Sequence, residues 1–139
     1  MSENEMNEAG DTLERAKALQ EEGARLFEQR QEEDALRLYR AAGSLFRISM
    51  ESTVSPETAH RYALLLQGLA VAAAVTGRID EARFAVGTGL VNISVARKTW
   101  PDIDEFAELQ QTFASLEEKL GGNCPIYLSD EPENWLSDD

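Results

Sequence analysis

Few side chains of this chain have the types and spacings that covalent or metal chemistry requires. His60 is the only histidine and Cys124 the only cysteine, so one chain cannot assemble a Cys/His metal cluster or pair a nucleophile with a histidine base. The acidic run at 32–34 falls where a helix is expected to start, and acids there complement the helix dipole. The Gly-Thr-Gly run at 87–89 lies inside a helical pattern rather than in a phosphate-binding loop. The sequence therefore predicts no enzyme, no cofactor and no metal site.

The formal net charge of -13 is concentrated at the two ends of the chain. Residues 1–15 carry five acids and one base, residues 101–139 carry eleven acids and one base, and residues 16–100 carry ten acids and eleven bases. This distribution disfavours binding to nucleic acid or to an anionic membrane, and it favours a protein partner with a basic surface. An acidic inhibitor that competes with nucleic acid for a basic protein is an alternative, but such mimicry needs acids along the middle of the chain as well.

Several features predict a cytoplasmic protein. The opening segment is acidic and has no apolar run, unlike a secretory signal. A single cysteine cannot form an internal disulfide, and this fits a reducing compartment. The longest apolar run, from Tyr62 to Val75, is interrupted by Gln67 and is shorter than the roughly 20 residues that a membrane span requires. We therefore expect this run to form a buried helix.

Hydrophobic periodicity and helix-end signals divide the chain into helices. Asp11 and Glu14 have the spacing of a capping box at the first start. Pro56 suits the first turn of the third helix, and Gly77 tolerates the left-handed conformation that follows a helix end. The helices are expected near residues 11–30, 32–50, 55–76, 79–97 and 102–120.

The expected third and fourth helices form the apolar centre of the chain. Between Ala63 and Ala96, small residues alternate with larger ones such as Leu64 and Val75, a mixture that lets antiparallel helices pack closely. A shift of 47 residues superposes RQEEDALRLYRAA (30–42) on GRIDEARFAVGTG (77–89), and two helices per unit indicate a helical solenoid. We predict an all-α fold of about five antiparallel helices over 11–121, between a disordered acidic segment at 1–10 and an acidic, flexible tail at 122–139.

The spacing of small and large residues resembles the tetratricopeptide repeat (TPR) family. The longer period and the segment GRIDEA are similar to the long-helix variant found in kinesin light chains. The resemblance implies two units and a capping fifth helix that together bind a protein or peptide segment. The matching positions are Gly23, Ala35, Tyr39 and Ala42 in the first unit and Ala70, Ala82, Val86 and Gly89 in the second.

The resemblance also implies where a ligand lies. The paired asparagines that line the groove of the long-helix variant correspond here to Gln67 and Gly68, which are therefore candidate binding residues. A glycine within a helix costs about 1 kcal/mol relative to alanine, and either tight helix crossing or a groove for a partner's backbone explains Gly68. The clamp that holds the carboxyl terminus of heat-shock chaperones corresponds to Gln20 and Ala24, so that ligand is not expected.

The acidic tail contains more large apolar side chains than a solubilising extension requires. Tyr127, Trp135 and Leu136 lie among five acids in residues 122–139, a composition suited to a binding element. We expect the tail to dock in a partner or in this protein's own helices, the alternative being a charged extension only. Its candidate targets within the helical domain are Arg61, Arg78 and Arg83.

We expect a non-catalytic adaptor or chaperone-like module that binds a protein or peptide segment. The acidic inhibitor described above and a regulatory subunit of an enzyme complex are the two alternatives. The outer sides of the first and fifth helices are charged, as solenoid caps need to be. A monomer is therefore favoured, with a dimer as the alternative.

Overall fold

The computed structural model describes the backbone of residues 3–52 and 54–124 and the side chains of residues 11–51 and 54–124. The described part of the chain contains helices and no strand, so the predicted all-α fold is confirmed. Its five helices are α1 (Glu3–Glu28), α2 (Glu32–Ser52), α3 (Pro56–Val75), α4 (Ile79–Thr99) and α5 (Glu105–Lys119).

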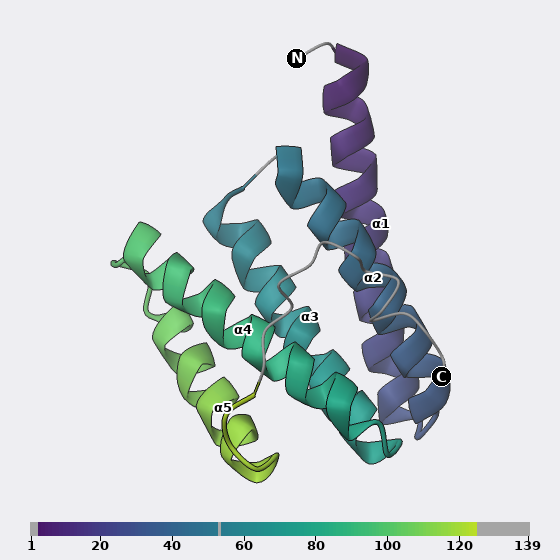
Figure 1. Cartoon of the computed structure of the whole chain (residues 1–139). Helices are drawn as coiled ribbons and strands as arrows, with labels where there is room; N and C mark the ends of the chain where they lie inside the picture. Colours follow the sequence, from purple (N-terminus) through teal and green to yellow (C-terminus); the bar gives the residue numbers. More distant parts are fainter. Residues whose placement is uncertain (1–2, 53, 125–139) are drawn as a thin grey trace.

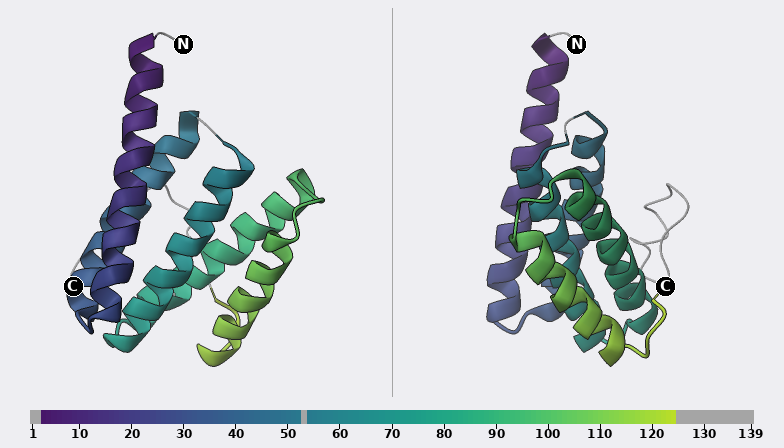
Figure 2. Two further views of the ribbon diagram at one scale, coloured as in Figure 1. Left: turned by 180° about the vertical axis from the view of Figure 1, so that it is seen from behind. Right: turned by 90° about the vertical axis from the view of Figure 1, so that its left-hand side faces the viewer.

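The helices form two layers. Each packs on its neighbour in the sequence, and α3 also contacts both α1 and α5. Seen from behind, α1, α3 and α5 lie side by side with α3 in the middle, and α2 and α4 lie on their far side (Figure 2). We call α1, α3 and α5 the inner layer and α2 and α4 the outer layer. Two antiparallel hairpins, α1–α2 and α3–α4, are thus followed by a single helix (Figure 1).

Most predicted helix ends agree with the structure to within three residues, but the predicted first start at residue 11 is wrong. Helix α1 begins at Glu3 and its first turns extend beyond the other helices (Figure 1). Residues 3–10 include glutamate, methionine and alanine, which are good helix formers. Extending a helix that has already formed needs no new nucleation. The helix therefore continues toward the N-terminus past Asp11, and the capping-box spacing there does not mark its first residue.

The two hairpins turn in the same way. Gln31 N donates to Leu26 O at 2.9 Å in the first turn, and Arg78 N donates to Ala73 O at 2.8 Å in the second. Each bond encloses one residue of positive φ, Arg30 at 62° and Gly77 at 84°, as in a Schellman helix end. These two residues are 47 positions apart (77 − 30), so the sequence repeat is also a backbone repeat.

A continuous apolar core runs between the layers. The predicted centre of the chain lies within it, and Ala63, Leu66 and Ala73 are fully buried. Leu64 and Val75 were expected to pack between the third and fourth helices and are instead 36% and 58% exposed, and Ile79 at the start of α4 is 45% exposed. These side chains lie on sides of α3 and α4 that face solvent and not the other helices. The largest fully buried side chains are Phe46, Phe106, Phe113, Leu36, Leu65, Leu66, Leu69, Ile93 and Val86.

Candidate binding groove

Helix α3 presents one face to solvent along the middle of the inner layer. Residues spaced three and four apart lie on the same side of a helix. On α3 this spacing selects side chains that are exposed or only partly buried, whereas the opposite side is fully buried. We call this set the α3 strip. It consists of Glu57, His60, Leu64, Gln67, Val71 and Val75.

A hollow of about 330 Å³ lies between the α3 strip and α1. Leu64, Gln67 and Val71 of the strip form one wall, together with Gly68. Phe27 of α1 and Tyr39 of α2 complete the lining, and we call this the apolar hollow. Its lining can bury an apolar side chain of a ligand, because Gln67 is its only amide and no charged side chain lines it.

Two glycines allow Tyr39 to reach this hollow from the outer layer. A Cβ atom added at Gly23 of α1 would lie 2.9 Å from Cε1 of the tyrosine ring, and one added at Gly68 of α3 would lie 2.9 Å from Cζ. The ring therefore passes between the two inner helices where neither has a side chain. Burial raises the pKa of the Tyr39 hydroxyl, and the nearby Glu28 carboxylate raises it further.

A second hollow, of about 380 Å³, lies between the first turns of α3 and α5. The rings of His60 and Phe106 meet edge to face with centroids 6.2 Å apart, and Trp100 stacks on Phe106 at 6.0 Å. Glu57 and Glu105 supply the charged part of the lining. We call this the acidic hollow. Pro56 and Ile103 are the other residues that line it.

The candidate residues Arg61, Arg78 and Arg83 do not share a surface. Arg61 lies beside the α3 strip and donates to the Glu21 carboxylate of α1 at 3.3 Å. Arg78 donates to Glu33 of α2 at 3.0 Å. Arg83 of α4 donates to the backbone carbonyls that follow α5, at 3.0 Å to Gly122, 3.2 Å to Asn123, and also to Leu120. Each of the three therefore links separate segments of the chain, and none of them lines either hollow.

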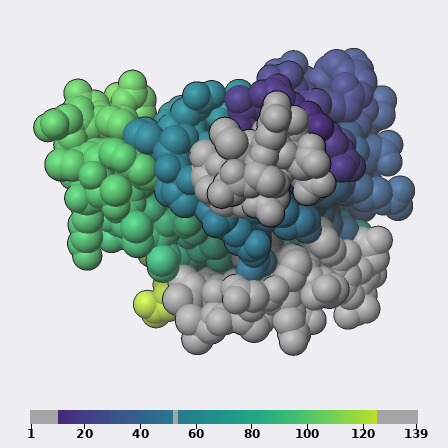
Figure 3. All heavy atoms as spheres, turned by 90° about the horizontal axis from the view of Figure 1, so that it is seen from above, coloured from purple at the N-terminus to yellow at the C-terminus, as the bar shows by residue number. Residues whose placement is uncertain are grey.

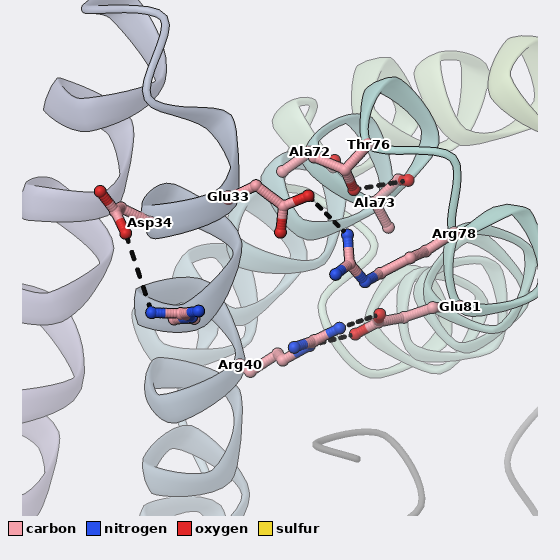
Figure 4. A network of polar contacts seen from close by, with 9 residues as sticks. Glu33, Asp34, Arg40, Ala72, Ala73, Thr76, Arg78 and Glu81 are labelled. Carbon is pink, nitrogen blue, oxygen red and sulfur yellow. Dashed lines mark hydrogen bonds and ion pairs between the residues drawn. The ribbon is translucent and has the colours of Figure 1, made fainter. Parts of the chain in front are cut away.

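A buried ion pair joins the two hairpins (Figure 4). The Arg40 guanidinium of α2 donates to both carboxylate oxygens of Glu81 of α4, at 2.8 and 2.6 Å. The side chains are only 5% and 13% exposed. The neighbouring Arg78–Glu33 pair makes the same connection at the surface, where Glu33 is 59% exposed and the Arg78 guanidinium lowers the pKa of its carboxyl.

No protein-family model, curated protein or solved structure matches this chain. Within the described residues, His, Cys, Asp and Glu side chains form no group of three or more that suits a metal ion. None of the helices in the same part of the chain has the length and apolarity of a membrane span. The candidate residues Tyr127, Trp135 and Leu136 lie outside the described residues.

The candidate residues Gln67 and Gly68 both line the apolar hollow. The structure adds lining residues that the sequence did not single out for binding. Phe27 and Tyr39 lie on the apolar sides of their helices, and helical periodicity does not single them out, because an apolar residue has the same pattern whether it faces a core or a groove. The weak signal for Tyr39 was the presence of a glycine at both 23 and 68. The acidic hollow had no signal, because its two glutamates are 48 residues apart (105 − 57).

Proposed function

We propose that this protein is a non-catalytic, TPR-like interaction module that binds a protein or peptide segment along the α3 strip. The apolar hollow is the observation that carries this proposal. Its apolar lining faces solvent beside Leu64, which is 36% exposed. Covering such a surface releases water and stabilises a complex. A partner segment that fills the hollow provides that cover.

The pairing of helices and the small residues support the TPR assignment. The hairpins repeat at 47 residues in both sequence and turn geometry. Gly23 and Tyr39 were matched to the small and large positions of the motif, and they contact each other across α1 and α2. The family resemblance adds an adaptor or chaperone-like role, in which one face of stacked helices receives a segment of another protein.

Charge and surface favour a monomer with a basic partner, in the cytoplasm. The outer side of α5 is polar, with Glu108, Gln111 and Ser115 exposed, so it suits a cap better than a subunit interface. An inhibitor that mimics nucleic acid needs carboxylates in a row, whereas Leu64, Gln67 and Val71 interrupt the α3 strip with uncharged side chains. A protein segment is therefore the better ligand.

Site-specific photocrosslinking in cells of the source organism tests the proposal. A photoreactive phenylalanine analogue replaces Val75 at the end of the α3 strip or, as the matched control, Val95 on α4. Both valines are 58% exposed. We expect a discrete crosslinked protein from position 75 that is lost when Leu64→Glu is added, and none from position 95. Equal crosslinking from the two positions, or a specific product from position 95 alone, would contradict binding along the α3 strip.

A further inference from the structure

The two hollows lie along the same face of α3 but differ in chemistry. Glu57 and His60 border the acidic hollow, and Leu64, Gln67 and Val71 border the apolar hollow. The centres of their α3 residues are about nine residues apart, an axial distance of about 14 Å at 1.5 Å per residue. The hollows also lie on opposite flanks of α3, toward α5 and toward α1, which adds a sideways step of about 9 Å. An extended peptide covers the combined distance in about four to six residues. One ligand segment laid along the α3 strip can thus reach both hollows.

The acidic hollow has the properties of a site for a guanidinium group. Its two carboxylates face no lysine or arginine within the lining. Lys17 Nζ reaches Glu57 at 3.4 Å from α1, but Glu57 is 75% exposed, and such surface pairs contribute little. Pro56, Ile103 and the rings of His60 and Phe106 provide an apolar wall. An arginine side chain offers a flat cation on an apolar stem, and both parts match this lining.

The apolar hollow takes the other end of the segment. A leucine, methionine or phenylalanine side chain can occupy it, with Tyr39 as floor and Leu64 and Val71 as wall. Gln67 lines the apolar hollow and offers an amide donor and acceptor to a peptide backbone. The same strip can thereby hold a main chain and orient two side chains.

We infer that the ligand is an extended segment in which an arginine lies about four to six residues from a large apolar side chain. The inference rests on the proposed function and specifies its partner. This protein's own residues 125–139 include five acids and no lysine or arginine, so they do not complement the acidic hollow. A basic segment of another protein does, and the acidic ends of the chain attract it over longer distances.

Fluorescence anisotropy with labelled synthetic peptides tests this inference on the full chain. The set contains Arg-Ser-Gly-Ser-Leu and its reverse, with linkers lengthened by four residues as spacing controls. We expect the four-residue spacing to bind better than the eight-residue spacing. Replacing the peptide arginine by citrulline, which keeps the shape and removes the charge, should weaken binding about fivefold, as should Glu105→Gln; this corresponds to about 1 kcal/mol. In Glu105→Gln protein the citrulline change should have almost no further effect.

Glu108→Gln is the matched control, because Glu108 is exposed on the same helix and does not line the hollow. It should leave peptide affinity unchanged. Peptides that bind through leucine with no coupling between arginine and Glu105 would overturn the inference and leave the proposed function intact. Failure of every peptide to bind would also overturn it. The proposed function is then judged by the crosslinks from position 75, which need no knowledge of the ligand.

Discussion

The junction between α2 and α3 and the junction between α4 and α5 each place a large ring against a glycine of the facing helix, but the ring comes from opposite layers. At the first junction Tyr39 of the outer helix lies against Gly68 of the inner helix. At the second, Val86 stands at the position equivalent to Tyr39, 47 residues later. The large ring now comes from the inner helix, where Phe113 lies against Gly89 of α4.

The origin of the large ring decides whether it lies in the core or lines a hollow at the surface. Phe113 comes from the inner layer and points outward into the core, where it is fully buried, as is Val86. Tyr39 comes from the outer layer and points inward, so its ring reaches the solvent-facing side of α1 and α3. At the second junction the space around Val86 and Phe113 is filled, whereas at the first junction the Tyr39 ring lines the apolar hollow. The proposed binding surface thus depends on the direction in which the Tyr39 ring points.

The largest expected effect comes from breaking the buried connection between the two hairpins. Glu81→Gln removes a negative charge that faces a buried guanidinium, Arg40. Loss of one partner from a buried ion pair destabilises by about 3 kcal/mol. Urea unfolding should show this loss as a lower midpoint with an unchanged slope. Glu33→Gln, in the exposed pair with Arg78, is the control and should leave the midpoint almost unchanged. Equal losses would mean that burial does not distinguish the two pairs.

The contact between Gly89 of α4 and the Phe113 ring leaves no space for an added carbon atom. In Gly89→Ala the new Cβ would lie 2.5 Å from Cζ of Phe113, a ring with no exposed surface. We expect a loss of about 2 kcal/mol from overpacking. Gly43→Ala is the matched control in a helix, because its Cβ would lie 3.6 Å from Leu65 Cδ1, an ordinary contact. It should gain about 0.5–1 kcal/mol from helix propensity. Phe113→Leu added to Gly89→Ala should restore part of the loss.

Alkaline unfolding should act on the first junction. Tyr62 of α3 packs on Phe46 of α2, and burial raises its pKa to about 12. A tyrosine whose pKa is raised in the folded state stabilises the fold at pH values below its pKa in the unfolded chain, about 10. This stabilisation is lost as the pH rises toward the pKa of the folded state. Stability should therefore fall by about 1.4 kcal/mol between pH 9 and pH 11 from Tyr62, with a further loss from Tyr39. Tyr62→Phe should flatten this slope in urea titrations at each pH; a slope that persists unchanged would assign it to other groups.

The helices could be predicted from the sequence, but the hollows on their surface could not. Hydrophobic periodicity, Pro56 and Gly77 predicted the helices and their pairing, because these signals are local. The hollow depends on Gly23, Tyr39 and Gly68, which are distant in sequence and act together only after packing. The same holds for Arg40 and Glu81, 41 residues apart. Local patterns assign a residue to the apolar side of a helix without showing whether another helix covers that side.

The smallest effect tests how closely the two hairpin turns correspond. Arg30 and Gly77 occupy the same left-handed position, but only the glycine adopts it without strain. Arg30 is exposed, so Arg30→Gly should relieve the strain, although glycine also gives the unfolded chain more freedom. The net gain should be about 0.5–1 kcal/mol, or roughly 3 °C in Tm. No atom lies within 4 Å of a Cβ added at Gly77, so Gly77→Ala introduces strain without a clash and should cost a similar amount in the opposite direction. Calorimetry of the two variants measures both changes in Tm. A lower Tm for Arg30→Gly would mean that the arginine side chain stabilises the first turn by more than its left-handed backbone conformation costs.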